Sequence, residues 1–179
     1  MHCFTVPNIE ELPEQSKPTL EKIERTLGVV PNLFKLLGSS PNVLGGFTQL
    51  QAALGQTLTA KTREAIALAV AQINGCQYCL SAHTYISEHM MHVAQEEILL
   101  NRKGRSLDPK VDAIVAFAAS VVEKRGHVER SEIEVLRAKG VSDREVIEIV
   151  AVVAENVFTN LINEVAKTEI DFPQVEVNL

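Results

Sequence analysis

The sequence contains no tryptophan and few other aromatic residues, with two tyrosines and six phenylalanines among 179 residues. Hydrophobic residues nevertheless make up 46% of the chain. The core therefore has to be built from Ala, Val, Leu and Ile in closely packed helices. A chain of this length can bury the core of one domain, and we expect residues 1–179 to form a single domain.

The chain also lacks a long apolar run, a secretory signal and an excess of positive charge. No apolar run is longer than that of residues 65–71, which is far short of the roughly 20 residues that a membrane span needs, and residues 1–8 have no basic region followed by an apolar stretch. The formal net charge of -6 gives nucleic acids and anionic membranes no basic surface. The short basic cluster of Arg102, Lys103 and Arg105 is expected to be a solvated helix end. We therefore expect a cytoplasmic protein that binds neither nucleic acid nor membrane.

Cysteine is scarce as well. Three cysteines cannot form a full set of structural disulfides, and the cytosol keeps thiols reduced. Two of them stand in Cys76-Gln77-Tyr78-Cys79, a spacing that in such a compartment is more often catalytic or metal-binding than structural. Cys3 lies in an irregular N-terminal arm and is expected to be incidental.

Strand patterns are nearly missing, whereas helical periodicity runs through most of the chain. We predict an all-α, single-domain bundle of about eight helices, with an irregular arm over residues 1–16 and an extended tail over residues 173–179. Thr59 is the expected N-cap of a helix over 60–73, and Gly75 its left-handed stop. The CxxC helix should follow at once, over 76–91. Ser131 and Ser142 are the expected caps of the last two helices, over 132–139 and 143–168.

The CxxC helix places Cys79, His83, Ile86 and Met90 on one stripe. His83 is one turn from Cys79, within hydrogen-bond reach. A neighbouring imidazole and the free N–H groups of the first helical turn both favour a thiolate at Cys79. Cys76, at the start of the helix, is free to close onto Cys79 once that sulfur is oxidised.

Glu64 begins a helix whose next seven residues are all apolar. It is held either at a wet helix end or in the interior beside a partner. If the two helices pack as an antiparallel hairpin, that partner is His83. A zinc site built from Cys76, Cys79 and His83, with Glu64 or water as the fourth ligand, is the main rival. We expect no metal, because structural zinc normally draws on a second ligand pair.

Two further groups are open to more than one interpretation. Asn156, Asn160 and Asn163 form an amide stripe on the last helix. A solvent or subunit-contact face is the default expectation for this stripe, and a polar pocket wall is the alternative. His89 and His92 lie off the stripe of Cys79 and are expected at the surface or at a helix end.

The pattern Arg63-Glu64 … Gly75-Cys76-Gln77-Tyr78-Cys79 … His83 resembles the signature of the alkylhydroperoxidase D-like, or carboxymuconolactone decarboxylase, superfamily. That signature is a glutamate, then CxxC, then a histidine four residues after the second cysteine. The segment from Val30-Pro-Asn-Leu-Phe to Pro41-Asn-Val-Leu, and a closing helix with Asn156 and Asn163, resemble its peroxidase-related branch. The resemblance covers residues 25–172.

The resemblance implies a thiol-dependent peroxidase with four catalytic residues. Cys79 would be the peroxidatic thiolate that attacks a hydroperoxide, Cys76 would resolve it as a disulfide, and His83 would relay the proton with the help of Glu64. No resident cofactor is implied, but an external dithiol reductant protein is. The family's best-known peroxidase has a histidine between its cysteines, where this chain has Tyr78. The decarboxylase branch typically lacks the cysteine pair.

The resemblance also implies a homo-oligomer, since family members typically form dimers, trimers or hexamers. Ala-rich helices that can approach closely, and short N-terminal helices with apolar faces that need cover, fit this expectation. Two other classes of function stay open from the sequence. One is a redox-sensing or metal-binding module without turnover, and the other is a helical scaffold with a vestigial site.

Overall fold

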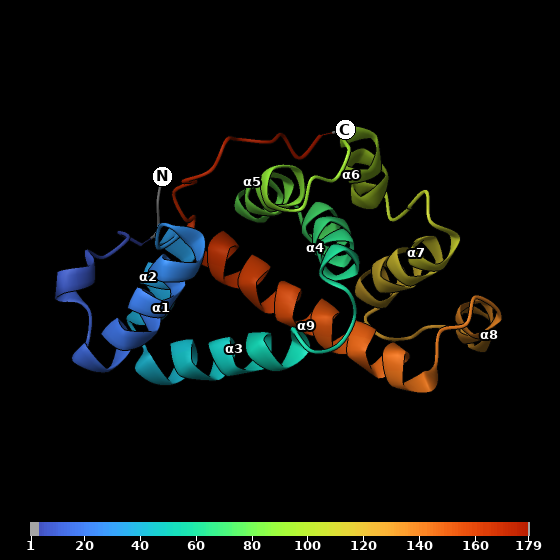
Figure 1. The fold of residues 1–179 in the computed structure, drawn as a ribbon, viewed down its shortest axis with the longest axis horizontal. Helices are drawn as coiled ribbons and strands as arrows, with labels where there is room; N and C mark the ends of the chain where they lie inside the picture. Colours follow the sequence, from blue (N-terminus) through green and yellow to red (C-terminus); the bar gives the residue numbers. More distant parts are fainter. Residues whose placement is uncertain (1–3, 179) are drawn as a thin grey trace.

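The computed structural model describes residues 4–178, and within that range the protein is all-α (Figure 1). The helices are α1 (Lys17–Leu27), α2 (Asn32–Gly38), α3 (Pro41–Leu54), α4 (Ala60–Asn74), α5 (Gln77–Tyr85), α6 (Gln95–Arg102), α7 (Pro109–Glu123), α8 (Arg130–Ala138) and α9 (Asp143–Ala166). The all-α prediction is confirmed. The N-terminal arm, expected to be irregular, contains two short 3-10 helices, Ile9–Glu11 and Glu14–Ser16. Cys3 lies outside the described residues.

Helix α4 lies at the centre of the bundle and packs against α5, α6, α7 and α9. This position explains the apolar run of the sequence, because every residue from 65 to 71 is at most 2% exposed. A helix that is apolar on all sides has to be buried on all sides. Figure 1 shows α4 enclosed by these neighbours, with the long α9 crossing the molecule beneath it.

The N-terminal helices form a second core against α9. Phe34 of α2 and Phe47 of α3 pack with ring centroids 6.1 Å apart, and Phe47 packs on Phe158 of α9 at 5.6 Å. Leu20 of α1, which is 1% exposed, belongs to the same cluster. Three of the six phenylalanines thus lie where the first three helices join the rest of the bundle.

Most predicted helix boundaries are present as expected. The side chains of Thr59 and Ser142 accept hydrogen bonds from the N–H groups of Thr62 and Glu145, and Gly75 ends α4 with φ +68°. The prediction of Ser131 as a cap is wrong, because α8 begins earlier, with Glu129 as its N-cap. The reason is tertiary. Glu132 bonds back to the Glu129 N–H, accepts from the Ser120 hydroxyl and pairs with Lys124, which fixes the start of the helix.

The end of the chain forms what we call the C-terminal strap, residues 167–178. Helix α9 stops at Ala166, so the non-helical tail begins before the predicted residue 173. Figure 1 shows the strap passing over α5 toward α6. The Val175 N–H donates to Ser81 Oγ at 3.0 Å, and Arg102 donates to the Glu176 carbonyl at 2.6 Å. The prediction that Arg102 belongs to a solvated helix end is therefore wrong. Arg102 is only 7% exposed, and it anchors the strap.

The helices of the described chain are too short or too polar to cross a lipid bilayer, α9 included.

Candidate functional site

The site begins with the turn between α4 and α5. Gly75 has a left-handed φ of +68°, a conformation that glycine adopts without a steric penalty. The Cys76 N–H then donates to the Ala71 carbonyl at 3.0 Å, and α5 packs back against α4. This hairpin brings the start of α4, which carries Glu64, beside the end of α5, which carries His83.

Cys76 and Cys79 are joined as a disulfide in the first turn of α5, with their Cα atoms 5.3 Å apart. Cys76 is the N-cap of the helix, and its sulfur accepts the Cys79 N–H at 3.3 Å. The sulfur of Cys79 accepts instead from the side-chain amide of Asn163 on α9, at 3.4 Å. Each sulfur thus has its own hydrogen-bond donor. The helix N–H that was expected to favour Cys79 points to Cys76.

The predicted contact between Glu64 and His83 is present. His83 Nδ1 lies 2.8 Å from Glu64 Oε2, and the two side chains are 21% and 17% exposed. Burial lowers the pKa of His83, but the charge and the hydrogen bond of Glu64, with a smaller contribution from Glu155, raise it overall. The imidazole of His83 therefore holds its proton more firmly beside Glu64 than a free imidazole does in water.

His83 has no hydrogen bond to Cys79 within residues 4–178, where its bond goes to Glu64. The sequence placed His83 within reach of Cys79 but could not show which neighbour it prefers. A charge-assisted bond to a carboxylate is stronger than a bond to sulfur, which explains the choice.

Glu155 of α9 is a member of this site that the sequence reasoning missed. Burial raises the pKa of its carboxyl group, the nearby charges of His83 and Arg63 oppose that effect, and Glu64 adds to it. The charges of Glu64, His83 and Glu155, from α4, α5 and α9, thus influence one another. A Glu in the middle of a long helix has no sequence signal that separates it from a surface Glu.

The amide stripe of α9 faces inward, contrary to the default expectation. Asn156, Asn160 and Asn163 are 7%, 1% and 2% exposed. Asn163 reaches Cys79, and Asn160 Oδ1 accepts from Asn74 at 2.8 Å. The stripe is thus buried, with Asn163 beside the disulfide, and the alternative interpretation of a polar pocket wall stays a prediction.

Tyr78, between the two cysteines, is a packing residue. Its hydroxyl accepts the Leu33 N–H at 3.2 Å, and its ring meets Phe172 of the strap edge-on at 5.8 Å. Burial raises the pKa of the Tyr78 hydroxyl, so this group stays neutral. Tyr78, Phe172 and Val177 of the strap enclose the cysteine pair on one side.

Within residues 4–178, no group of three or more His, Cys, Asp or Glu side chains is arranged to hold a metal ion. His89 and His92 are exposed, as expected. His89 stacks on Tyr85 with ring centroids 4.5 Å apart.

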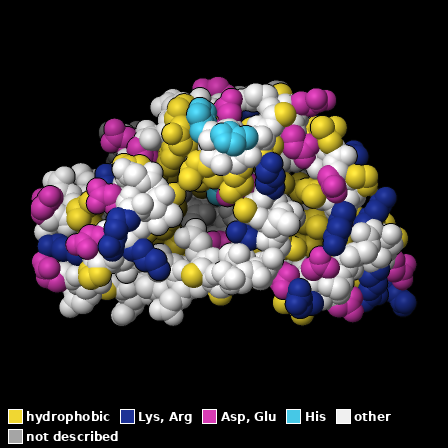
Figure 2. All heavy atoms as spheres, viewed as in Figure 1, with side chains coloured by type: hydrophobic (Ala, Val, Ile, Leu, Met, Phe, Trp, Pro, Cys, Tyr) yellow, Lys and Arg dark blue, Asp and Glu magenta, His cyan; other side chains and the backbone are white. Residues whose placement is uncertain are grey.

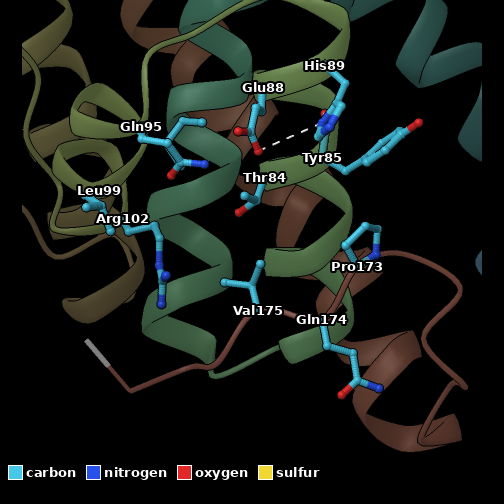
Figure 3. Close-up of a pocket in the computed structure, with 11 residues that line it drawn as sticks. Thr84, Tyr85, Glu88, His89, Gln95, Leu99, Arg102, Pro173, Gln174 and Val175 are labelled. Carbon is cyan, nitrogen blue, oxygen red and sulfur yellow. Dashed lines mark hydrogen bonds and ion pairs between the residues drawn. The ribbon is translucent and has the colours of Figure 1, made fainter.

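Two cavities lie away from the cysteines. One of about 190 Å³ lies between the π-helical turn Ile86–Met90, α6 and the strap, and Figure 3 shows Thr84, Glu88, Arg102 and Val175 around it. Another of about 710 Å³ lies between α4, α6, α7 and the start of α9. Figure 2 shows a further hollow between α5 and the N-terminal helices, on the side where α5 meets α9.

Comparisons with known proteins agree with this architecture. Residues 41–103, which include Glu64, both cysteines and His83, match the model of the carboxymuconolactone decarboxylase family. A search of curated proteins found no match to the chain.

Several solved structures share the fold over nearly the whole chain. A peroxidase-related protein from Silicibacter sp. TM1040 is 28% identical, with a TM-score of 0.82 over 94% of this chain and 91% of that one. A peroxidase-related protein from Ralstonia eutropha JMP134, described as an alkylhydroperoxidase AhpD core, is 24% identical, with a TM-score of 0.84 over 95% and 92%. The debrominase Bmp8, solved with 2,3,4-tribromopyrrole, is 22% identical, with a TM-score of 0.79 over 96% and 94%. The chain therefore has the alkylhydroperoxidase D-like fold, and its residues 41–103 are similar to the carboxymuconolactone decarboxylase family.

Proposed function

We propose that this protein is a thiol-dependent peroxidase that reduces hydroperoxides through Cys76 and Cys79. One observation carries the proposal. Helix α5 holds a bonded cysteine pair at its N-terminus and, one turn later, an imidazole hydrogen-bonded to a largely buried carboxylate. A redox pair next to a proton donor is what the reduction of an O–O bond requires.

In the reaction that we propose, the Cys79 thiolate attacks one oxygen of the hydroperoxide. The S–O bond forms, the O–O bond breaks, and the departing alkoxide takes a proton from the His83 imidazolium that Glu64 stabilises. The Cys76 thiol then attacks the sulfenic sulfur and gives its proton to the departing hydroxide, so that the disulfide forms and water leaves. An external dithiol is oxidised to its own disulfide and returns both cysteines to thiols.

Cys79 is the proposed nucleophile for two reasons. It accepts a hydrogen bond from the Asn163 amide, which stabilises the thiolate, and it is the slightly more exposed of the two residues, at 3% against 0% for Cys76. Cys76, held as the helix cap, is positioned to resolve. The assignment makes a directional prediction, since Cys79→Ser should abolish peroxide consumption whereas Cys76→Ser should still form a trappable sulfenic acid.

The reductant that we propose is a thiol–disulfide protein, and the compartment is the cytoplasm, where such reductants keep thiols reduced. The fold also hosts the debrominase described above. That similarity, at 22% identity, concerns the fold alone, and no feature of this site favours a brominated substrate.

The test is a stoichiometric titration of the reduced protein with a hydroperoxide, with free thiols counted and the disulfide mapped by mass spectrometry. We expect the rapid loss of two thiols per chain and a Cys76–Cys79 bond. Cys3→Ser is the matched control, because it removes the cysteine outside the pair and should leave the reaction unchanged.

Other results would point to the other classes. Thiols that stay unreacted would overturn the proposed peroxidase activity and favour a helical scaffold with a vestigial site. Stoichiometric metal in the protein as purified would favour a metal-binding module. A disulfide that forms once but is not turned over by any dithiol would favour a redox sensor.

A further inference from the structure

Arg102 carries a buried positive charge that no acidic side chain of residues 4–178 neutralises. The residue is 7% exposed, and all its hydrogen-bond partners are neutral: the Gln72 amide at 2.8 Å and the backbone carbonyls of Glu176 and Val177. Within the same residues, its Nη1 donates no hydrogen bond. A buried charge is costly unless an opposite charge is paired with it. An anionic group placed beside Arg102 is therefore favourable.

Arg102 lines the cavity of about 190 Å³ between the π-helical turn Ile86–Met90, α6 and the C-terminal strap, which we call the strap cavity. Thr84 lines the same cavity. Its Oγ1 is buried and has no hydrogen-bond partner among the described residues. A buried hydroxyl without a partner is uncommon in a folded protein and calls for an explanation, of which a bound molecule is one. Two groups that lack a partner thus meet at one cavity.

Glu88 brings a negative charge to this cavity. Figure 3 shows Glu88 and the guanidinium of Arg102 at opposite ends of it, with Thr84 between them. The ion pair of Glu88 with His89 is long, at 3.9 Å, and half exposed, so it contributes little. Glu88 would repel a simple anion and Arg102 a simple cation, whereas a molecule with one charge of each sign complements both ends.

We propose that the strap cavity binds a small amino acid as its zwitterion. The carboxylate of the ligand accepts from Nη1 of Arg102 and from the Thr84 hydroxyl, and its ammonium group pairs with Glu88. The size agrees, because a volume of about 190 Å³ holds about six water-sized groups, which is the size of alanine. Binding requires no step at Cys76 or Cys79, so this site can be tested whether or not the protein is a peroxidase.

The ligand also connects the strap to α5 and α6. Gln174 and Val175 of the strap line the cavity, and the Val175 N–H donates to Ser81 Oγ at 3.0 Å. A ligand that binds only while the strap is in place favours that state by mass action. Since the strap encloses the cysteine pair on one side, an occupied cavity is expected to slow the attack of a reductant on the disulfide.

Calorimetric titration of the whole protein tests the ligand, with L-alanine as the probe. Propionate, which lacks the ammonium group, and ethylamine, which lacks the carboxylate, are the matched controls. We expect alanine to bind about tenfold more tightly than either, because each control leaves one charge of the cavity unpaired. No binding of alanine at millimolar concentration would overturn the proposal. Propionate binding as tightly as alanine would overturn the role of Glu88.

Two variants test the contacts without removing the anchor of the strap. Thr84→Val keeps the shape of the side chain and should weaken alanine binding about tenfold. It should not weaken the fold, because the hydroxyl has no partner in the described chain. Glu88→Gln should bring the affinity for alanine down to that for propionate. Glu96→Gln is the matched control, since Glu96 is an exposed residue of α6 that does not line the cavity. An affinity unchanged by either Thr84→Val or Glu88→Gln would overturn the site.

Hydrogen exchange tests the link to the strap independently of the variants. Alanine at ten times its dissociation constant should slow the exchange of the Val175 amide about tenfold. The Glu129 amide, which bonds the Glu132 carboxylate at the start of α8, is the control and should exchange as before. Unchanged exchange at Val175 would place the bound alanine outside the strap cavity and overturn the proposal.

Discussion

Glu64 and His83 form a hydrogen bond of 2.8 Å in a position where both side chains are largely shielded from water. The buried carboxylate raises the pKa of the imidazole against the opposing effect of burial. A group with a raised pKa stabilises the fold fully below its unfolded pKa and loses that contribution as the pH rises through the folded value. For His83 this loss of stability begins as the pH rises above the ordinary histidine pKa of 6.5.

The first prediction concerns Glu64→Gln. Because burial remains while the charge is gone, the pKa of His83 should fall, and the free energy of unfolding at pH 6 should drop by about 1.5–3 kcal/mol. The loss should shrink as the pH rises, which urea melts across the pH range will measure. Glu88→Gln is the control, since Glu88 and His89 form an exposed pair at 3.9 Å. A loss that is the same at every pH would contradict the role of the ion pair.

The second prediction concerns Asn163, the hydrogen-bond donor to Cys79. A hydrogen bond to a charged group contributes about 1.5–3 kcal/mol, or about one to two pKa units. In reduced Cys76→Ser protein, Asn163→Leu should raise the pKa of the Cys79 thiol by about one unit, measured from alkylation rate against pH. Asn156→Leu is the control, because the Asn156 amide donates to the Val152 carbonyl of its own helix. An unmoved alkylation curve for Asn163→Leu would remove Asn163 from the site.

At the scale of the element, α4, α5 and the C-terminal strap together enclose the cysteine pair. Arg102 donates to Gln72 of α4 at 2.8 Å and to the Glu176 carbonyl at 2.6 Å, and Gln72 itself donates to the Val177 carbonyl at 2.6 Å. Burial lowers the pKa of this guanidinium, which nevertheless stays charged. One side chain thus ties α6, α4 and the strap together.

The third prediction is that Arg102→Ala loosens the strap. Loss of a charge-assisted bond of about 1.5–3 kcal/mol corresponds to an opening about 10- to 100-fold more frequent. Hydrogen exchange of the Val175 amide, which bonds Ser81, should accelerate accordingly. Lys103→Ala, one residue away and exposed, is the control. Unchanged exchange at Val175 would show that Arg102 does not hold the strap.

Local chemistry made most helix boundaries predictable, whereas tertiary contacts decided the rest. Thr59, Ser142 and Gly75 act within a few residues, so the sequence was enough for them. The start of α8 depends on Glu132 meeting Ser120 and Lys124, which no local pattern contains.

In the candidate site, too, local sequence patterns were enough for some residues, whereas tertiary contacts decided the place of others. Cys76, Cys79 and His83 lie on one helix, and the hairpin turn at Gly75 brought Glu64 to them, so the sequence could place all four. Glu155 and Asn163 reach the site from α9, about 70 residues or more along the chain. Their place depended on which face of α9 turns inward. Because the opposite face of α9 carries apolar side chains, the sequence of a single chain suggests that the amide face is the exposed one, whereas the structure buries it.

At the scale of the whole molecule, helix α9 exposes large apolar side chains in the described chain, among them Ile147 at 72% and Leu161 at 60%. If the homo-oligomer predicted from the sequence covers them, the stability of the fold depends on protein concentration, since association favours the native state by mass action. The fourth prediction is that the Tm of the wild type rises with protein concentration over a hundredfold range. Leu161→Glu should give a Tm that does not vary. A concentration-independent Tm for the wild type would contradict the homo-oligomer.

The burial of the disulfide also sets a size limit on the molecule that reduces it. Exchange requires a thiolate to attack one of the two sulfurs directly, yet Cys76 is 0% and Cys79 3% exposed, beneath the strap on one side and α9 on another. A sulfur fixed on the surface of a rigid protein cannot reach them while these elements stay in place. The thiol–disulfide protein that we propose as reductant therefore has to reach them with a protruding thiol on a flexible segment, so its shape, as much as its potential, decides whether it can restore the cysteines.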